Sequence, residues 1–115
     1  MNVKDVFIAV GHFMMVHTFV WFSSNAQFVD SLKSRAMLIC LVLALPTACV
    51  SFYASRFGYT AFGSVWAVRL IGFGISYIMF PLLSWILMNE SPFNLRTMIC
   101  IGLSALIVWV QLYLK

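Results

Sequence analysis

The chain has 115 residues, of which 63% are hydrophobic and 9% charged, with a formal net charge of +4. Soluble domains contain about 25% charged residues, and a chain this short cannot bury so much apolar surface in one aqueous core. This composition excludes an ordinary soluble domain, and the absence of any basic run gives no indication of nucleic-acid binding. We expect residues 1–115 to form a single transmembrane domain whose main partner is membrane lipid.

Four apolar segments approach the length of about 20 residues that a helix needs to cross a bilayer. They are residues 6–23, 36–53, 61–88 and 95–114. Polar or turn-rich pieces separate them, at residues 24–35, 54–59 and 89–94. In lipid every backbone N–H and C=O must be satisfied internally, and the alternating pattern of a barrel strand is absent, so the segments predict helices.

The first segment contains two histidines, His12 and His17. A cleaved signal peptide is an alternative, because Ser24-Asn25-Ala26 is an acceptable small-residue site, but the segment is long for a signal and holds these histidines. A histidine inside a span is a functional candidate, since it titrates near neutral pH and can relay protons. The alternative role is a hydrogen bond to a neighbouring helix.

Prolines and glycines predict where the second and third helices bend. Pro46 and Pro81 each remove a backbone hydrogen bond, so we expect a kink at both positions. Gly72 and Gly74 give the third segment a second soft point. At about 1.5 Å per residue, residues 61–88 would form about 42 Å of helix, against a hydrocarbon core of about 30 Å. The third helix is therefore expected to be long and kinked.

The fourth segment has both a start signal and small residues. Ser91 is expected to be the N-cap and Pro92 the first helical residue. Gly102 and Ala105 are small enough to let another helix approach closely. We expect them to pack against a helix of the same subunit or of a second copy.

Basic residues are balanced between the two sides of a four-span chain. One side has Lys4, Arg56 and Lys115, and the other has Lys33, Arg35 and Arg96. The positive-inside rule then gives no preferred orientation. Insertion in both orientations, which allows an antiparallel homodimer, is one interpretation. The alternatives are that a weak bias suffices or that a partner fixes the orientation.

Arg69 is a permanent cation inside the third segment, in the stretch WAVRLIGFG. On insertion scales an arginine at mid-membrane costs about 2.5–3.5 kcal/mol, so it should face a bundle interior or a wet cavity. Alternatively, the helix starts later and Arg69 snorkels to the interface, or it pairs with a carbonyl or a histidine. Trp66, one turn earlier, and Tyr77 can line a cavity around it, or they can belong to an interfacial belt or pack against lipid.

The sequence lacks the residues that most chemistry needs. The three carboxylates lie at segment ends: Asp5, Asp30 and Glu90. No buried acid is thus available to bind a cation or carry a coupling proton. The three cysteines lie inside apolar runs without metal or disulfide spacing: Cys40, Cys49 and Cys100. Since no nucleophile–base pair or phosphate loop is present, we expect neither an enzyme nor a cofactor or metal site.

Between Tyr53 and Val108, RFGYTAFGSVWAV leads into GFG, then LLSWILMNESPFN and ICIGLSALIV. In these stretches the chain resembles the small multidrug resistance proteins of the drug/metabolite transporter superfamily. YASRFGYTAF is similar to an uncharacterised four-helix branch that also has a basic residue in its third helix. The resemblance implies an antiparallel dimer that pairs through helix four. It also implies a pocket lined by an aromatic residue of helix three, near which Trp66 falls.

One departure from that family changes the expected ligand. The family's drug exporters have a Glu in the middle of helix one that binds the substrate cation or proton, whereas this region reads HFMMVHTFVW. Arg69 adds a positive charge where a cation exporter would not want one. The resemblance therefore implies a pocket for neutral or anionic ligands.

Together these features predict an all-α integral membrane protein, a four-helix bundle in the cell's inner (plasma) membrane. The expected function is transport of a small polar or anionic metabolite by alternating access, as a homodimer. Arg69 would supply charge, Trp66 and Tyr77 the walls, and His12 or His17 a polar contact. The alternative is a non-transporting subunit or assembly factor that packs within a larger membrane complex.

Overall fold

The computed structural model describes residues 2–114 and contains four long helices. They are α1 (Val3–Asn25), α2 (Ala36–Phe62), α3 (Val65–Met88) and α4 (Leu95–Tyr113). Two short 3₁₀ turns, η1 (Ala26–Phe28) and η2 (Lys33–Arg35), lie between α1 and α2. All four long helices are long and apolar enough to cross a membrane, which indicates a multi-pass membrane protein.

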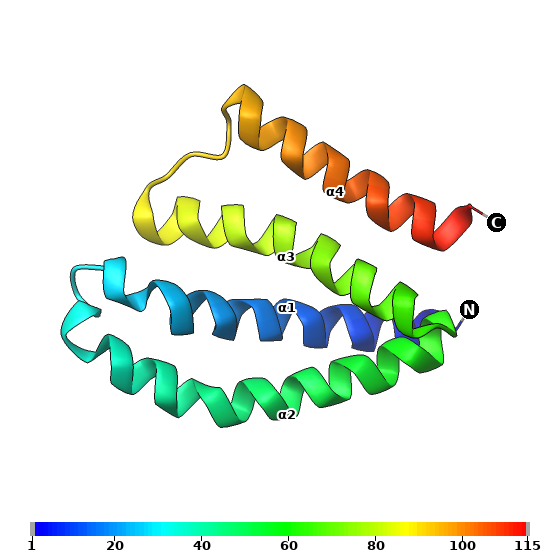
Figure 1. Cartoon of the computed structure of the whole chain (residues 1–115), viewed down its shortest axis with the longest axis horizontal. Helices are drawn as coiled ribbons and strands as arrows, with labels where there is room; N and C mark the ends of the chain where they lie inside the picture. The colour runs from blue at the N-terminus through cyan, green and yellow to red at the C-terminus, as the bar shows by residue number, and fades with distance from the viewer. Residues whose placement is uncertain (1, 115) are drawn as a thin grey trace.

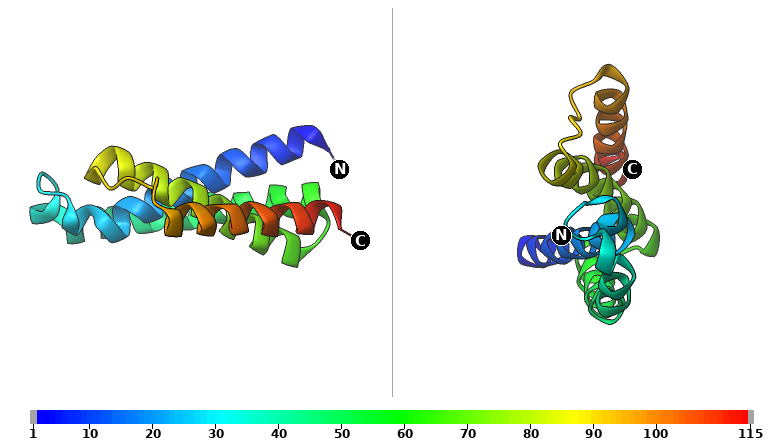
Figure 2. Two further views of the ribbon diagram at one scale, coloured as in Figure 1. Left: turned by 90° about the horizontal axis from the view of Figure 1, so that it is seen from above. Right: turned by 90° about the vertical axis from the view of Figure 1, so that its left-hand side faces the viewer.

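The helices lie side by side in the order α2, α1, α3, α4 (Figure 1). The row is thin, with extents of 47 × 36 × 19 Å, and the N-terminal half of α1 steps out of it (Figure 2). The start of α1, the end of α4 and the α2–α3 turn lie at one end of the bundle (Figure 1). The α1–α2 and α3–α4 connections lie at the other. The outer helix α4 packs against α3, while α1 stands between α2 and α3.

The boundary between the second and third helices differs from the prediction. The sequence pattern predicts a connection at residues 54–59, but α2 continues through them to Phe62. Gly63 then adopts a left-handed conformation, with φ 74°, and its N–H donates to the carbonyl of Tyr59. Ser64 caps α3 by accepting a hydrogen bond from the N–H of Ala67. At about 1.5 Å per residue, α3 is about 36 Å long and shorter than expected.

Small residues explain why α2 extends so far. Ala54, Gly58 and Ala61 are its buried residues, spaced at helical intervals along the side that packs against the other helices. The polar residues among them, such as Ser55 and Arg56, are exposed. The last part of α2 is therefore amphipathic, with one buried and one exposed side. A search for uniformly apolar spans does not detect such a segment.

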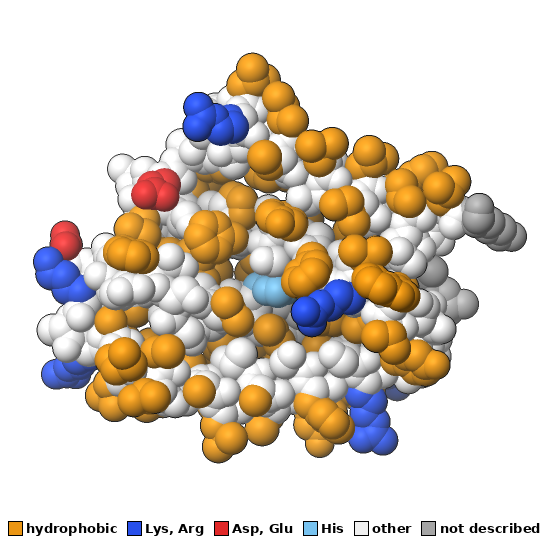
Figure 3. Space-filling view, viewed as in Figure 1, with side chains coloured by type: hydrophobic (Ala, Val, Ile, Leu, Met, Phe, Trp, Pro, Cys, Tyr) orange, Lys and Arg blue, Asp and Glu red, His pale blue; other side chains and the backbone are white. Residues whose placement is uncertain are grey.

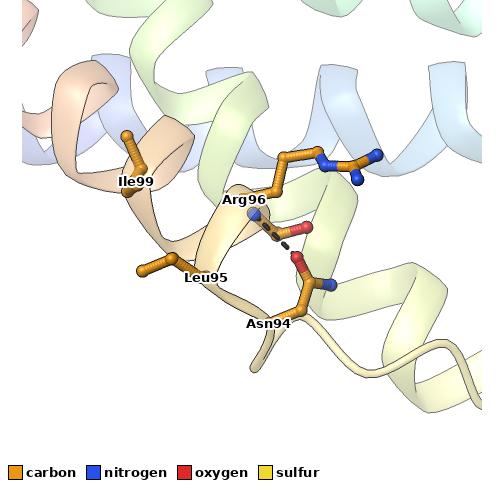
Figure 4. Close-up of a pocket in the computed structure, with 5 residues that line it drawn as sticks. Asn94, Leu95, Arg96 and Ile99 are labelled. Carbon is orange, nitrogen blue, oxygen red and sulfur yellow. Dashed lines mark hydrogen bonds between the residues drawn. The ribbon is translucent and has the colours of Figure 1, made fainter.

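The start of the fourth helix also differs from the prediction. Asn94, and not Ser91, is the N-cap: its side-chain oxygen accepts a hydrogen bond from the N–H of Thr97 at 2.8 Å (Figure 4). The Ser91 hydroxyl instead accepts from the N–H of Phe93 at 3.2 Å, inside the connection. Pro92 consequently lies before the helix rather than in its first turn.

Both interior prolines lie within continuous helices. Pro46 is inside α2 and Pro81 inside α3. The ribbon of α2 is bowed gently along its whole length (Figure 1), and the kinks expected at the two prolines stay predictions.

The core sits where α1 meets α2 and α3. Its buried cluster contains Phe13, Val16, Ala54 and Val68. Phe13 fits there because Gly72 of α3 has no side chain: a Cβ atom at that position would lie 3.0 Å from Phe13 Cε1. Close approach at small residues is how helices associate in lipid, where neighbouring apolar tails offer no hydrophobic driving force.

Candidate functional site

One side of α3 combines a permanent charge with aromatic side chains on the protein surface. We define the α3 face by its exposed residues: Trp66, Arg69, Phe73, Tyr77 and Phe80. Spacings of three and four residues place them on one side of the helix. Trp66 is 74% exposed and Tyr77 54% exposed. In the single chain this face is open along most of the helix.

The α3 face lies between the lines along which α1 and α4 pack. Gly72 contacts Phe13 of α1, and Gly74 contacts Val108 of α4. At about 100° per residue, Phe73 and Arg69 project between these two directions. The face therefore lies between α1 and α4, and on the α4 side Tyr77 and Phe80 line a groove. A space-filling view shows a histidine beside a basic side chain near the middle of one broad face, with hydrophobic side chains around them (Figure 3).

Arg69 lies over an aromatic ring of its own helix. Its guanidinium carbon, Cζ, is 4.9 Å from the centroid of the Phe73 ring. This contact is a cation–π interaction between residues one turn apart. Within residues 2–114 no carboxylate forms an ion pair with Arg69. Its positive charge is thus uncompensated by any acid in the described part of the chain.

The depth of Arg69 follows from where α3 begins. The helix starts at Val65, so Arg69 lies about 6 Å along it, instead of the 12 Å or so implied by a start at residue 61. A position this near the start of α3 would suit the snorkelling alternative, but the guanidinium lies over Phe73, one turn further into the helix and away from that end. In the single chain Arg69 is exposed and does not face the interior of a bundle.

His17 makes the polar contact between α1 and α3. Its Nε2 atom lies 2.8 Å from the carbonyl oxygen of Gly72, and since a carbonyl only accepts, the imidazole donates. The ring is half-buried and stacks on Phe13, with centroids 6.5 Å apart. Gly72 is one turn beyond Arg69, so His17 is held beside the α3 face. The structure thus shows the bond to a neighbouring helix that was the alternative role for this residue.

His12 is directed elsewhere. Its Nδ1 atom donates to the carbonyl of Ile8 in the same helix, at 2.8 Å. The ring lies 5.5 Å from that of Phe57 in α2. Of the five predicted ligand-binding residues, Arg69, Trp66 and Tyr77 therefore share one face, His17 lies next to it, and His12 lies on the α2 side of α1.

Two contacts in the structure, one with an aromatic ring and one between polar groups, were not predicted from the sequence. Phe73, whose ring lies under the Arg69 guanidinium, follows Arg69 by four residues, and this spacing can be read directly from the sequence. Trp21, only 1% exposed, donates from Nε1 to the Ser84 hydroxyl at 3.0 Å, and this bond joins α1 to α3. No local signal connects two residues 63 positions apart, so sequence reasoning had no means of finding this pair.

Of the residues predicted to bend or pack the helices, the two glycines of α3 contact neighbouring helices of the same chain, whereas within residues 2–114 the two small residues of α4 do not. Gly72 and Gly74 are both buried contact points for neighbouring helices. A Cβ atom added at Gly102 would meet no atom within 4 Å, and Ala105 is exposed. Ser104, between them, is buried and faces α3. Gly102 and Ala105 therefore make no close contact within the described part of the chain and are free to contact another molecule.

Arg96 provides a second positive charge near the α3 face. Its side chain points away from those of Leu95 and Ile99, which lie on the opposite side of α4 (Figure 4). With Tyr77 and Phe80 it lines a groove of about 360 Å³ between α3 and α4. Among residues 2–114, no three His, Cys, Asp or Glu side chains lie close enough together to hold a metal ion.

These features describe a surface suited to a ligand that carries negative charge or accepts hydrogen bonds. The guanidinium of Arg69 offers several donors in a planar arrangement, and the flanking rings offer apolar walls. Comparisons with protein families, curated proteins and solved structures found no match to this chain. The functional interpretation therefore rests on the geometry of the α3 face.

Proposed function

We propose that the protein is a small membrane transporter of the drug/metabolite type, which moves a small polar or anionic metabolite by alternating access as a homodimer. The supporting observation is the unpaired charge of Arg69 on an exposed, aromatic face of an apolar helix. Such a charge is costly against lipid. A second copy placed over the α3 face would remove it from lipid and enclose a cavity between the two chains.

The chemistry of that face favours the proposed ligand class. A permanent cation without a neighbouring acid attracts carboxylates, phosphates and other electron-rich groups, and repels the cations that drug exporters of the small multidrug resistance type carry. Trp66 and Tyr77 expose rings that would form the walls. His17 uses Nε2 for Gly72, so in a neutral ring Nδ1 would accept a hydrogen bond only from a ligand that has its own donor, such as a hydroxyl group.

The fourth helix supports a dimer in the same proposal. Gly102 and Ala105 lie on the outer side of α4, where a helix of a second copy can approach closely. Antiparallel pairing is compatible with the balance of basic residues between the two ends. The described residues Lys4, Arg56 and Arg69 lie toward one end and Lys33, Arg35 and Arg96 toward the other, while Lys115 lies outside the described residues.

Alternating access requires helices that change shape. In the proposal Pro46 of α2 and Pro81 of α3 are points where these helices bend, since each interrupts the backbone hydrogen-bond ladder. Gly72 and Gly74 add freedom beside the ligand, at the two places where α1 and α4 contact α3.

The proposal is tested by transport into proteoliposomes. The probes are a panel of mono- and dicarboxylates, organic phosphates and neutral polyols, with uptake measured under counterflow. We expect uptake of at least one anionic or polar probe and its loss in Arg69→Leu. The matched control is Arg56→Leu, which removes an exposed arginine of α2 that lies outside the α3 face. Unchanged uptake in Arg69→Leu would show that this pocket is wrong.

A second candidate function is that of a non-transporting subunit in a larger membrane complex. The observation in its favour is α4, in which only Ser104 is fully buried, so that the side turned away from α3 is open to another protein. This role predicts that the chain purifies together with a different polypeptide and loses its fold when that partner is removed. The transporter proposal predicts a stable homodimer on its own.

A further inference from the structure

A groove between α1 and α2 lies away from the α3 face, at the end of the bundle that carries the α1–α2 connection. Its volume is about 590 Å³. Apolar side chains form most of its lining, among them Phe19 and Phe22 of α1 and Leu38, Ile39 and Leu43 of α2. The other notable lining residue is Arg35, which directly precedes α2.

The charge and the apolar wall are in register along one helix face. Leu38, Ile39 and Leu43 follow Arg35 by three, four and eight residues, the spacing of a single helical stripe. Arg35 stands at the end of this stripe, where α2 leaves the membrane. The wall extends from it about 12 Å toward the membrane interior. A molecule that fills the groove therefore meets a cation at the headgroup level and hydrocarbon-like surface below.

The positive charge at the rim is not neutralised within the protein. Lys33 pairs with Asp30, with Nζ and Oδ1 3.4 Å apart. Among residues 2–114 no carboxylate forms an ion pair with Arg35, which is exposed. The Arg35 guanidinium thus retains its hydrogen-bond donors for a group outside the chain.

From this juxtaposition we infer that the α1–α2 groove is a binding site for an anionic phospholipid. One acyl chain lies against Phe19, Ile39 and Leu43, and the phosphate accepts hydrogen bonds from Arg35. An anionic headgroup is favoured over a zwitterionic one because the latter brings its own cation to a rim that is already positive. One basic contact of this kind corresponds to roughly fivefold tighter binding. The site is independent of the proposed transport function.

The inference is tested on the purified full chain with defined lipids. The protein in detergent is mixed with equal amounts of phosphatidylglycerol and phosphatidylcholine of identical acyl chains, and retained lipids are counted by native mass spectrometry. We expect one phosphatidylglycerol per chain to be retained, with a preference of roughly fivefold over phosphatidylcholine. Equal retention of the two lipids by the native chain would overturn the inference.

Two variants separate the headgroup contact from the groove. Arg35→Gln should abolish the preference for phosphatidylglycerol, while Ile39→Trp, which fills the groove, should reduce retention of both lipids. Arg56→Gln makes the same charge change toward the other end of the bundle and should leave the preference unchanged. If Arg56→Gln lowers the preference as much as Arg35→Gln, net charge alone is responsible and the site is refuted. Helix content measured by circular dichroism shows whether each compared variant is folded. If Ile39→Trp does not fold, the result for Arg35→Gln alone decides whether the headgroup contact exists.

Discussion

His17 of α1 donates a hydrogen bond from Nε2 to the carbonyl oxygen of Gly72 in α3, at 2.8 Å. The missing side chain of Gly72 lets Phe13, the ring that stacks with His17, approach α3 closely at the same place. The hydrogen bond joins two helices next to the exposed Arg69. The packing of the bundle and the geometry of the candidate site therefore depend on the same pair of residues.

Removing this bond should weaken the packing of α1 on α3. We expect His17→Ala to lower the free energy of unfolding by about 1 kcal/mol, since inter-helix hydrogen bonds in membranes contribute about 0.6 kcal/mol on average and some ring packing on Phe13 is also lost. The measurement is unfolding of the purified protein in mixed micelles. His12→Ala is the control, because its bond to Ile8 lies within one helix. Equal losses in the two variants would contradict the assigned role of His17.

A side chain at Gly72 should be poorly tolerated. The Cβ of an alanine there would lie 3.0 Å from Phe13 Cε1, and overpacking of this kind costs about 1–3 kcal/mol. We expect Gly72→Ala to lower the unfolding midpoint of the purified protein.

Gly11 provides the matched control for Gly72. It lies in α1 with no atom within 4 Å of an added Cβ, so Gly11→Ala should be neutral or slightly stabilising, because alanine favours helix. A Gly72→Ala protein as stable as Gly11→Ala would mean that Phe13 moves aside without cost.

The buried pair of Trp21 and Ser84 should show measurable coupling. In Ser84→Ala the indole N–H loses its partner in a site where Trp21 is 1% exposed, which costs about 1–3 kcal/mol. A double-mutant cycle with Trp21→Phe isolates the bond itself, and we expect a coupling energy of about 0.6–1.7 kcal/mol. Thr97→Ala, a change at a partly exposed hydroxyl residue of α4, is the control. Purely additive effects of Trp21→Phe and Ser84→Ala would show that the two residues do not interact.

The helical architecture could be predicted from the sequence because lipid leaves the backbone few choices. The four apolar segments correspond to α1–α4, and the connection at residues 89–94 is confirmed. The exact ends depend on caps and left-handed residues. Gly63 ends α2 and Asn94 starts α4, and a hydropathy pattern detects neither.

The candidate site could be predicted only as far as one helix determines it. The spacing of Trp66, Arg69 and Tyr77 places them on a common face of α3, and they share it in the structure. Which side of α1 faces α3 depends on packing, so two histidines five residues apart could not be separated in advance. The structure assigns His17 to α3 and His12 to α2.

The orientation of the chain in the membrane should be balanced and easily shifted. Basic residues stay on the cytoplasmic side, and they are nearly equal in number at the two ends of the bundle. A pair of compartment-specific reporters fused after Lys115 should therefore give signal from both sides of the membrane. Such a result is what an antiparallel dimer requires, whereas signal from one side only would leave that dimer without support.

Single charge changes at the two ends should move this balance in opposite directions. Arg96→Gln removes a positive charge from the end that holds the α1–α2 and α3–α4 connections, so more copies should have their C-terminus in the cytoplasm. Arg56→Gln removes one from the other end and should shift the same reporters the opposite way. Because the two substitutions are chemically identical and both residues are exposed, the comparison controls for expression and fold. A shift in the same direction, or none from either variant, would mean that something other than these basic residues, such as a partner protein, sets the topology.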